Sequence, residues 1–164
     1  MNNIHRKSLL IDTNLLLLLL IGSLDPSLIQ KEKITANQGF DEADFNQLRN
    51  FAVKFQKLVT TPHILTEVSN HADKIKGASH GKFFQRFMSL IETLDERSEA
   101  SKILAKTDTF ERFGLTDTAI RHLAKENILV LTVDFPLAGY LQKKGLKVIN
   151  FNNVRQIPQT DWAY

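Results

Sequence analysis

The fold class is decided by the stretch Ile128-Leu129-Val130-Leu131-Thr132-Val133-Asp134. Its nearly continuous apolar side chains predict a strand that is buried on both faces and that ends at the aspartate. A helix over 136–144, a stop at Gly145 and a second strand over 147–150 follow. Because a strand, a helix and a strand in this order need a crossover connection, the pattern predicts a parallel sheet covered by helices.

The amino-terminal region shows the same strand signal. The run Ser8-Leu9-Leu10-Ile11 predicts another buried strand, and Asp12 ends it. We expect Asn14 to cap a helix over 15–21, and Gly22 to end that helix. The sequence therefore predicts an α/β protein whose parallel sheet carries helices on its faces.

The middle of the chain predicts three more helices and one more strand. Apolar residues recur with helical spacing from Asp41 onward, and the run 58–60 predicts a short strand. Thr61 and Pro62 are typical of the start of a second helix, and a third follows Gly81. We expect the polar stretch 25–39 to be an exposed connection, and we find no strand in 95–114. Thr116 is expected to cap the helix that precedes the strand over 128–133.

Length and composition favour a single domain over residues 1–164. The chain has 43% hydrophobic and 24% charged residues, which is typical of globular proteins. It contains no cysteine, which excludes disulfides, zinc–thiolate sites and thiol catalysis and fits a reducing, cytoplasmic location. The formal charge of +3 permits a polyanionic partner without requiring one.

The apolar run 15–21 has two further interpretations. After His5, Arg6 and Lys7 it resembles a short secretory signal, but Asp12 interrupts it. It is also shorter than the roughly 20 apolar residues that a membrane span needs, so we expect no membrane association. Its apolar character on nearly all sides indicates burial, either within the monomer or at the interface of a homodimer.

Four acidic residues are predicted to meet at one edge of the sheet. Asp12 and Asp134 each follow a parallel strand directly, and the carboxyl ends of such strands line the functional groove. Asp117 starts a helix whose amino end approaches that edge, and Glu67 lies one turn inside the helix that follows strand 58–60. Clustered carboxylates raise one another's pKa values, so a compensating cation is expected. Mg²⁺ or Mn²⁺, as one or two ions, suits oxygen ligands and phosphoryl-transfer chemistry.

These residues resemble the PIN domain family over nearly the whole chain. The resemblance is carried by Leu10-Ile11-Asp12-Thr13-Asn14, Glu67, Gly114-Leu115-Thr116-Asp117 and Val130-Leu131-Thr132-Val133-Asp134. It implies a sheet of about five parallel strands and a metal-dependent ribonuclease that cleaves single-stranded RNA. It further implies catalytic and metal-binding roles for Asp12, Glu67, Asp117 and Asp134, with support from Asn14 and Thr132. Small members of this family are often toxins held inactive by an antitoxin protein.

Simpler interpretations stay open. Each acid taken singly fits an ordinary turn or helix-end residue. His63, Glu67 and His71 share one helix and could bind a transition metal, although no cysteine assists. Cations over 74–86, interleaved with Phe83 and Phe84, fit either a nucleic-acid contact or a solvated face over core phenylalanines. The whole domain could also be a catalytically silent module that binds RNA or a protein partner.

Overall fold

A single five-stranded sheet organises the protein. The structure is a computed structural model that describes residues 8–162. The strands have the order β3-β2-β1-β4-β5, and all four pairings are parallel. Their bounds are β1 (Ser8–Ile11), β2 (Lys57–Thr60), β3 (Asp95–Glu96), β4 (Leu129–Thr132) and β5 (Val148–Asn150). The predicted α/β class with about five parallel strands is confirmed.

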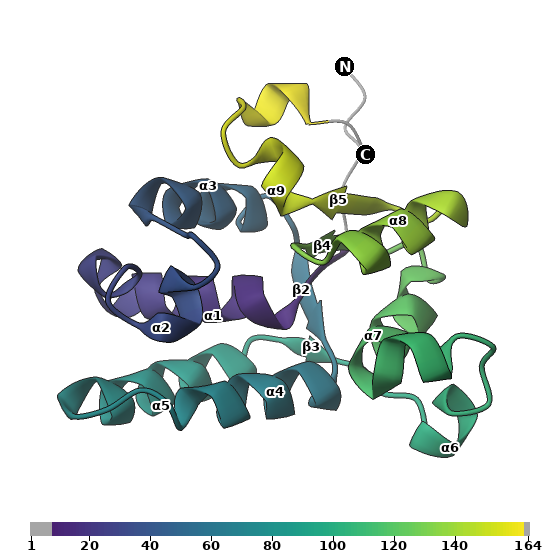
Figure 1. Ribbon diagram of the computed structural model, residues 1–164, viewed down its shortest axis with the longest axis horizontal. Coiled ribbons are helices and arrows are strands. Elements are labelled where there is room, and N and C mark those ends of the chain that lie inside the picture. The colour runs from purple at the N-terminus through teal and green to yellow at the C-terminus, as the bar shows by residue number, and fades with distance from the viewer. Residues whose placement is uncertain (1–7, 163–164) are drawn as a thin grey trace.

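Helices cover both faces of this sheet. Figure 1 shows α1, α2, α3 and α5 on one side, with α4 alongside α5, and α6, α7 and α8 on the other. The bounds of the helices are α1 (Thr13–Leu24), η1 (Pro26–Leu28), α2 (Lys33–Ala36), α3 (Glu42–Ala52), α4 (Pro62–Ala72), α5 (Ala78–Ile91), α6 (Ser101–Leu104), α7 (Phe110–Ala124), α8 (Phe135–Lys143), α9 (Phe151–Val154) and η2 (Gln159–Asp161).

The strand order creates a switch point between β1 and β4. From β1 the chain proceeds to its neighbour β2, and from β4 it proceeds in the opposite direction to β5. In open parallel sheets, ligand sites lie beyond the carboxyl ends of the strands at such a point. Asp12 and Asp134 stand there, because β1 ends at Ile11 and β4 ends at Thr132.

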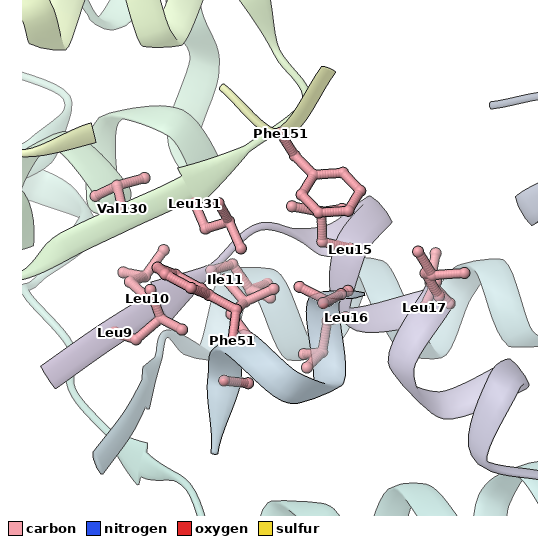
Figure 2. Packing of buried hydrophobic residues seen from close by; sticks show 14 of the residues in the cluster. Leu9, Leu10, Ile11, Leu15, Leu16, Leu17, Phe51, Val130, Leu131 and Phe151 are labelled. Atoms are coloured by element: carbon pink, nitrogen blue, oxygen red, sulfur yellow. The ribbon is translucent and has the colours of Figure 1, made fainter. Parts of the chain in front are cut away.

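The core is built around α1. This helix packs against α3, α4 and α5, and its residues 15–18 and 20–22 are all buried. Figure 2 shows Leu15 and Leu16 of α1 among buried residues of β1, β4, α3 and α9, with Leu15 drawn beside Phe151. Since the chain itself buries this helix on several sides, no subunit interface is needed to explain its composition.

Two sequence predictions for α1 are wrong. The side chain of Asp12, rather than that of Asn14, caps the helix by accepting a hydrogen bond from the Leu15 amide. Gly22 does not end the helix, which continues to Leu24. A Cβ on Gly22 would lie 2.3 Å from Cδ2 of Phe45, so glycine is needed for close packing against α3.

Two connecting segments also differ from expectation. The stretch 95–114 contains the edge strand β3 and α6, where we predicted no strand. The stretch 25–39 contains η1 and α2, and it is anchored by two fully buried residues, Ile29 and Thr35. The Thr35 hydroxyl donates to the Ile29 carbonyl at 2.6 Å, which stabilises this turn inside the core.

Helix α7 has a break that the sequence analysis did not foresee. Gly114 adopts a φ of 70° and a ψ of −172°, so the helix consists of two segments. A positive φ favours glycine, which has no Cβ to clash with the backbone. Thr116 lies inside the second segment, and the hydrogen bond of its hydroxyl goes to Glu67 rather than to a helix-end amide.

The carboxyl-terminal segment closes the far side of the core. Trp162 is buried, and its ring centroid lies 4.6 Å from that of Phe51 in α3 and 6.2 Å from that of Phe151 in α9. Its indole N–H donates to the Ile157 carbonyl at 3.3 Å. The end of the chain is thereby joined to a helix of its amino-terminal third.

None of the helices within 8–162 has both the length and the apolar character that a membrane span needs. His5, Arg6 and Lys7, which contributed the signal-like pattern, lie outside the described residues.

Candidate carboxylate site at the edge of the sheet

Asp12 and Asp134 are brought together by the pairing of β1 with β4. Ile11 is in register with Leu131, and the Asp12 amide donates to the Leu131 carbonyl at 3.0 Å. Asp12 therefore continues the ladder by one residue beyond β1. Its side chain reaches the first residues after β4, where Asp134 begins α8.

Three donors hold the Asp12 carboxylate in place. Oδ2 accepts from the Thr132 hydroxyl at 2.5 Å and from the Val133 amide at 2.8 Å, while Oδ1 accepts from the Leu15 amide at 2.9 Å. Burial raises the pKa of Asp12 above its ordinary value, and these hydrogen bonds lower it in part. The neighbouring charge of Asp134 raises it further. The three hydrogen bonds therefore leave the Asp12 side chain little conformational freedom.

Thr132 connects the two aspartates. Its hydroxyl donates to Asp12 and accepts a hydrogen bond from the Asp134 amide at 3.0 Å. The Asp134 carboxylate in turn caps α8, because Oδ1 accepts from the Leu137 amide at 2.6 Å. Asp134 is exposed, so its second oxygen is accessible from solvent. Thr132 thus contacts both aspartates, and its supporting role at a metal or substrate site stays a prediction.

Glu67 reaches the site from α4 and is oriented by two threonines. Thr13 donates to Oε2 at 2.8 Å, and Thr116 donates to Oε1 at 2.6 Å. These bonds join α4 to α1 and α7, across 54 and 49 residues of sequence. The sequence analysis gave no role to Thr13 and gave Thr116 a different one. The sequence signal that could have indicated these contacts is that Thr13 follows Asp12 directly and Thr116 precedes Asp117 directly.

Asp117 carries the strongest electrostatic sign of a shared site. Burial, followed by the charges of Asp134, Glu67 and Asp12, raises its pKa to about 7. Arg121, one turn later on α7, lowers it. Within the described chain no donor forms a hydrogen bond to this carboxylate. All four predicted acids therefore interact electrostatically at Asp117, which is the least compensated member of the group.

The same geometry limits direct metal ligation. In the described range 8–162, no three His, Asp or Glu side chains are grouped closely enough to hold a metal ion. Both oxygens of Asp12 and both oxygens of Glu67 accept hydrogen bonds from the protein. Among the described residues, the Asp117 carboxylate and one oxygen of Asp134 accept no hydrogen bond from the protein.

The remaining residues from the sequence analysis lie around this set. Asn14 is half-buried at the second position of α1. His71 lies near Glu67, whose charge raises its pKa, but burial and Lys74 lower the pKa overall. Phe83 is fully buried, so its ring is not free to stack on a base, and the partly buried Phe84 packs against the core. This favours the solvated-face interpretation of the cations over 74–86.

Comparison with known proteins adds no assignment, since no family model and no curated protein matches the chain. The arrangement of the acids at the switch point is thus the basis for the function argued below.

Proposed function

We propose that the protein is a metal-dependent endoribonuclease that hydrolyses phosphodiester bonds of single-stranded RNA. The observation that carries the proposal is the Asp117 carboxyl, whose pKa is raised to about 7 by burial and by three further acids. Four acids at a switch point, with one of them lacking any hydrogen-bond donor, form a site suited to a divalent cation. The choice of RNA as substrate comes from the resemblance of the motifs to PIN domains.

The donor set fits a hard cation such as Mg²⁺ or Mn²⁺. Asp12, Asp117 and Asp134 would hold one or two ions, with Glu67 beside them, and their chemistry is that of oxygen ligands. Such an ion supplies positive charge, which activates water and stabilises the negative charge that grows on the phosphate. For three of these carboxylates to bind one ion directly, their side chains would have to come closer together than they lie in the described structure.

The chain's own residues have separate parts in this proposal. Hydrogen bonds from Thr132, Leu15 and Val133 hold Asp12 in place, so that in this proposal it is the most rigidly positioned carboxylate of the site. Glu67 keeps lone pairs beyond its two threonine bonds, so it is placed to accept a proton from the attacking water. Asp134 and Asp117 lie on the open side, where a substrate phosphate would approach.

Two finer proposals follow from the family resemblance alone. The protein would act in the cytoplasm, and its activity would be controlled by an antitoxin protein that blocks the carboxylate site. The carboxylates that such a partner would cover lie at one edge of the sheet.

The test is cleavage of a mixed pool of end-labelled single-stranded RNA and DNA by the purified protein in Mn²⁺, Mg²⁺ or chelator. The variant Asp12→Asn/Asp134→Asn removes two of the four charges, and Asp73→Asn/Asp161→Asn makes the same change at exposed positions. We expect metal-dependent cleavage of RNA that the first variant loses and the second keeps. Equal cleavage by both variants would contradict the proposal.

One observation favours a second candidate, a catalytically silent module that binds RNA or a protein partner. The oxygens of Asp12 and Glu67 are already occupied by protein donors, which is also a stable structural arrangement for acids without a metal. RNA binding that persists in chelator and gives no product would select this candidate.

A further inference from the structure

A polar pocket lies between α7 and α8, beside the turn of α7 that carries Asp117. It has a volume of about 440 Å³. Its lining includes Thr118 and Arg121 of α7, Lys125 directly after that helix, Tyr140 of α8 and Lys144 directly after α8. None of the four acids of the candidate site is part of its lining. The volume lies within the range of small-molecule sites and exceeds what a bare inorganic anion fills.

Arg121 is a buried charge without a counter-ion. Its side chain is buried, with 7% of the residue exposed, and neither Nε nor Nη1 has a hydrogen-bond partner. The guanidinium carbon lies 3.8 Å from the ring centroid of Tyr140 and 4.9 Å from that of Phe113. These rings offset part of the charge but accept no strong hydrogen bond. No carboxylate of the described chain forms an ion pair with Arg121, although its charge is felt at Asp117.

The groups around Arg121 select for an anion with several oxygens. Lys125 and Lys144 are exposed at the pocket and add two positive charges. The Thr118 hydroxyl is buried without a partner. His122 pairs with Glu99 at 3.5 Å, so that Glu99 does not neutralise the positive charges of the pocket. Asp108 is the one carboxylate among the lining residues. A guanidinium, two ammonium groups and hydroxyl donors form the donor set that recognises phosphate.

We propose that this pocket binds the phosphate group of a nucleotide. Arg121 contributes the buried charge, Lys125 and Lys144 contribute charges at the mouth, and the remaining volume takes the nucleoside part. The nucleotide is either free or part of an RNA chain, and the two sources share this chemistry. The inference does not depend on the nuclease proposal, because it uses none of the four acids.

The test observes the pocket directly, in chelator, so that the carboxylate site takes no metal. The Arg121 Nε–H and the amides of 118–125 are followed by NMR during titration with AMP, with adenosine, and with a 5′-phosphorylated single-stranded RNA. We expect saturable shifts with AMP or with the RNA and none with adenosine. Shifts with RNA alone would assign the phosphate to a chain. Equal shifts with adenosine, or no saturable shift with AMP and RNA, would overturn the proposal.

Two sets of variants separate the pocket from general surface charge. Lys125→Met/Lys144→Met is expected to weaken binding about tenfold, whereas Lys143→Met/Lys147→Met, also exposed but outside the lining, leaves it within about twofold. Equal weakening by both pairs would contradict the pocket. Arg121→Met is expected to abolish binding and to melt no lower than the unmodified protein in phosphate-free buffer, since it removes an uncompensated buried charge. Unchanged binding by Arg121→Met would also overturn the proposal.

Discussion

The Thr132 hydroxyl lies 2.5 Å from Oδ2 of Asp12, and this bond joins the ends of β4 and β1. The Thr132 hydroxyl oxygen also accepts a hydrogen bond from the Asp134 amide. One side chain with no exposed surface thus fixes the relative positions of two acids that are separated by 122 residues in sequence. The geometry of the candidate site is therefore part of the core, not of a loop.

Removing this hydroxyl should destabilise the fold. In Thr132→Val the buried Asp12 carboxylate loses a donor, and we expect the free energy of unfolding to fall by about 1–3 kcal/mol. Thr60→Val is the matched control, because Thr60 is equally buried at the end of β2 and its hydroxyl has no partner. The control should be neutral or slightly stabilising in urea unfolding. Equal losses for the two variants would contradict a special role for Thr132.

Stability should decrease as the pH rises. The pKa of Asp117 is about 7 in the folded protein against 3.8 as its ordinary value, so the folded state binds more protons between these values. The free energy of unfolding therefore falls as the pH increases from about 4 to about 7, because the folded carboxyl resists ionisation. Without added divalent metal, thermal melts should show a weaker pH dependence for Asp117→Asn than for Asp73→Asn. The same pH dependence of Tm in both variants would refute Asp117 as its origin.

Divalent cations should stabilise the protein specifically. Since the four acids repel one another, Mn²⁺ or Mg²⁺ should raise Tm more than NaCl of equal ionic strength. At ten times the dissociation constant the gain is about 1.4 kcal/mol. The variant Asp12→Asn/Asp134→Asn should lose this difference. A melting temperature that does not respond to millimolar Mn²⁺ would count against a metal site.

Replacing two helical glycines by alanine should change the free energy of unfolding in opposite directions. In Gly22→Ala the new Cβ meets the Phe45 ring, and we expect a loss of about 1–3 kcal/mol from overpacking. Gly81 is also helical but has open space around it, so Gly81→Ala should stabilise the protein by about 0.5–1 kcal/mol. Urea unfolding of both variants checks the prediction. A stabilising Gly22→Ala would show that α3 moves away easily.

The sequence predicted most of the sheet, because four of its strands carry apolar runs. The fifth, β3, consists only of Asp95 and Glu96 at the sheet edge, where side-chain burial does not impose an apolar pattern. The end of α1 was mispredicted for a related reason. Gly22 has a local pattern typical of a stop, and only the Phe45 ring, which is 23 residues away, explains its place inside the helix.

The order of the acids indicated the candidate site, but their hydrogen bonds could not be predicted. Parallel strands bring their carboxyl ends to one edge, so Asp12 and Asp134 were expected to meet. Asp12 and Asn14 lie two residues apart and are both good caps, so the sequence alone did not identify which of them caps α1. The two threonine bonds to Glu67 cross three helices and left no local pattern. The electrostatic coupling at Asp117 likewise involves acids that are distant in sequence, so no local pattern predicts it.

Trp162 gives this chain an internal fluorescence probe. It is the single tryptophan, and its indole packs between Phe51 of α3 and Phe151 of α9. Emission from one position therefore reports whether the last turn remains docked on the first third of the chain. Because Trp162 packs against Phe51, a variant truncated before Trp162 would leave the Phe51 ring more exposed to water, and such a protein should aggregate more readily.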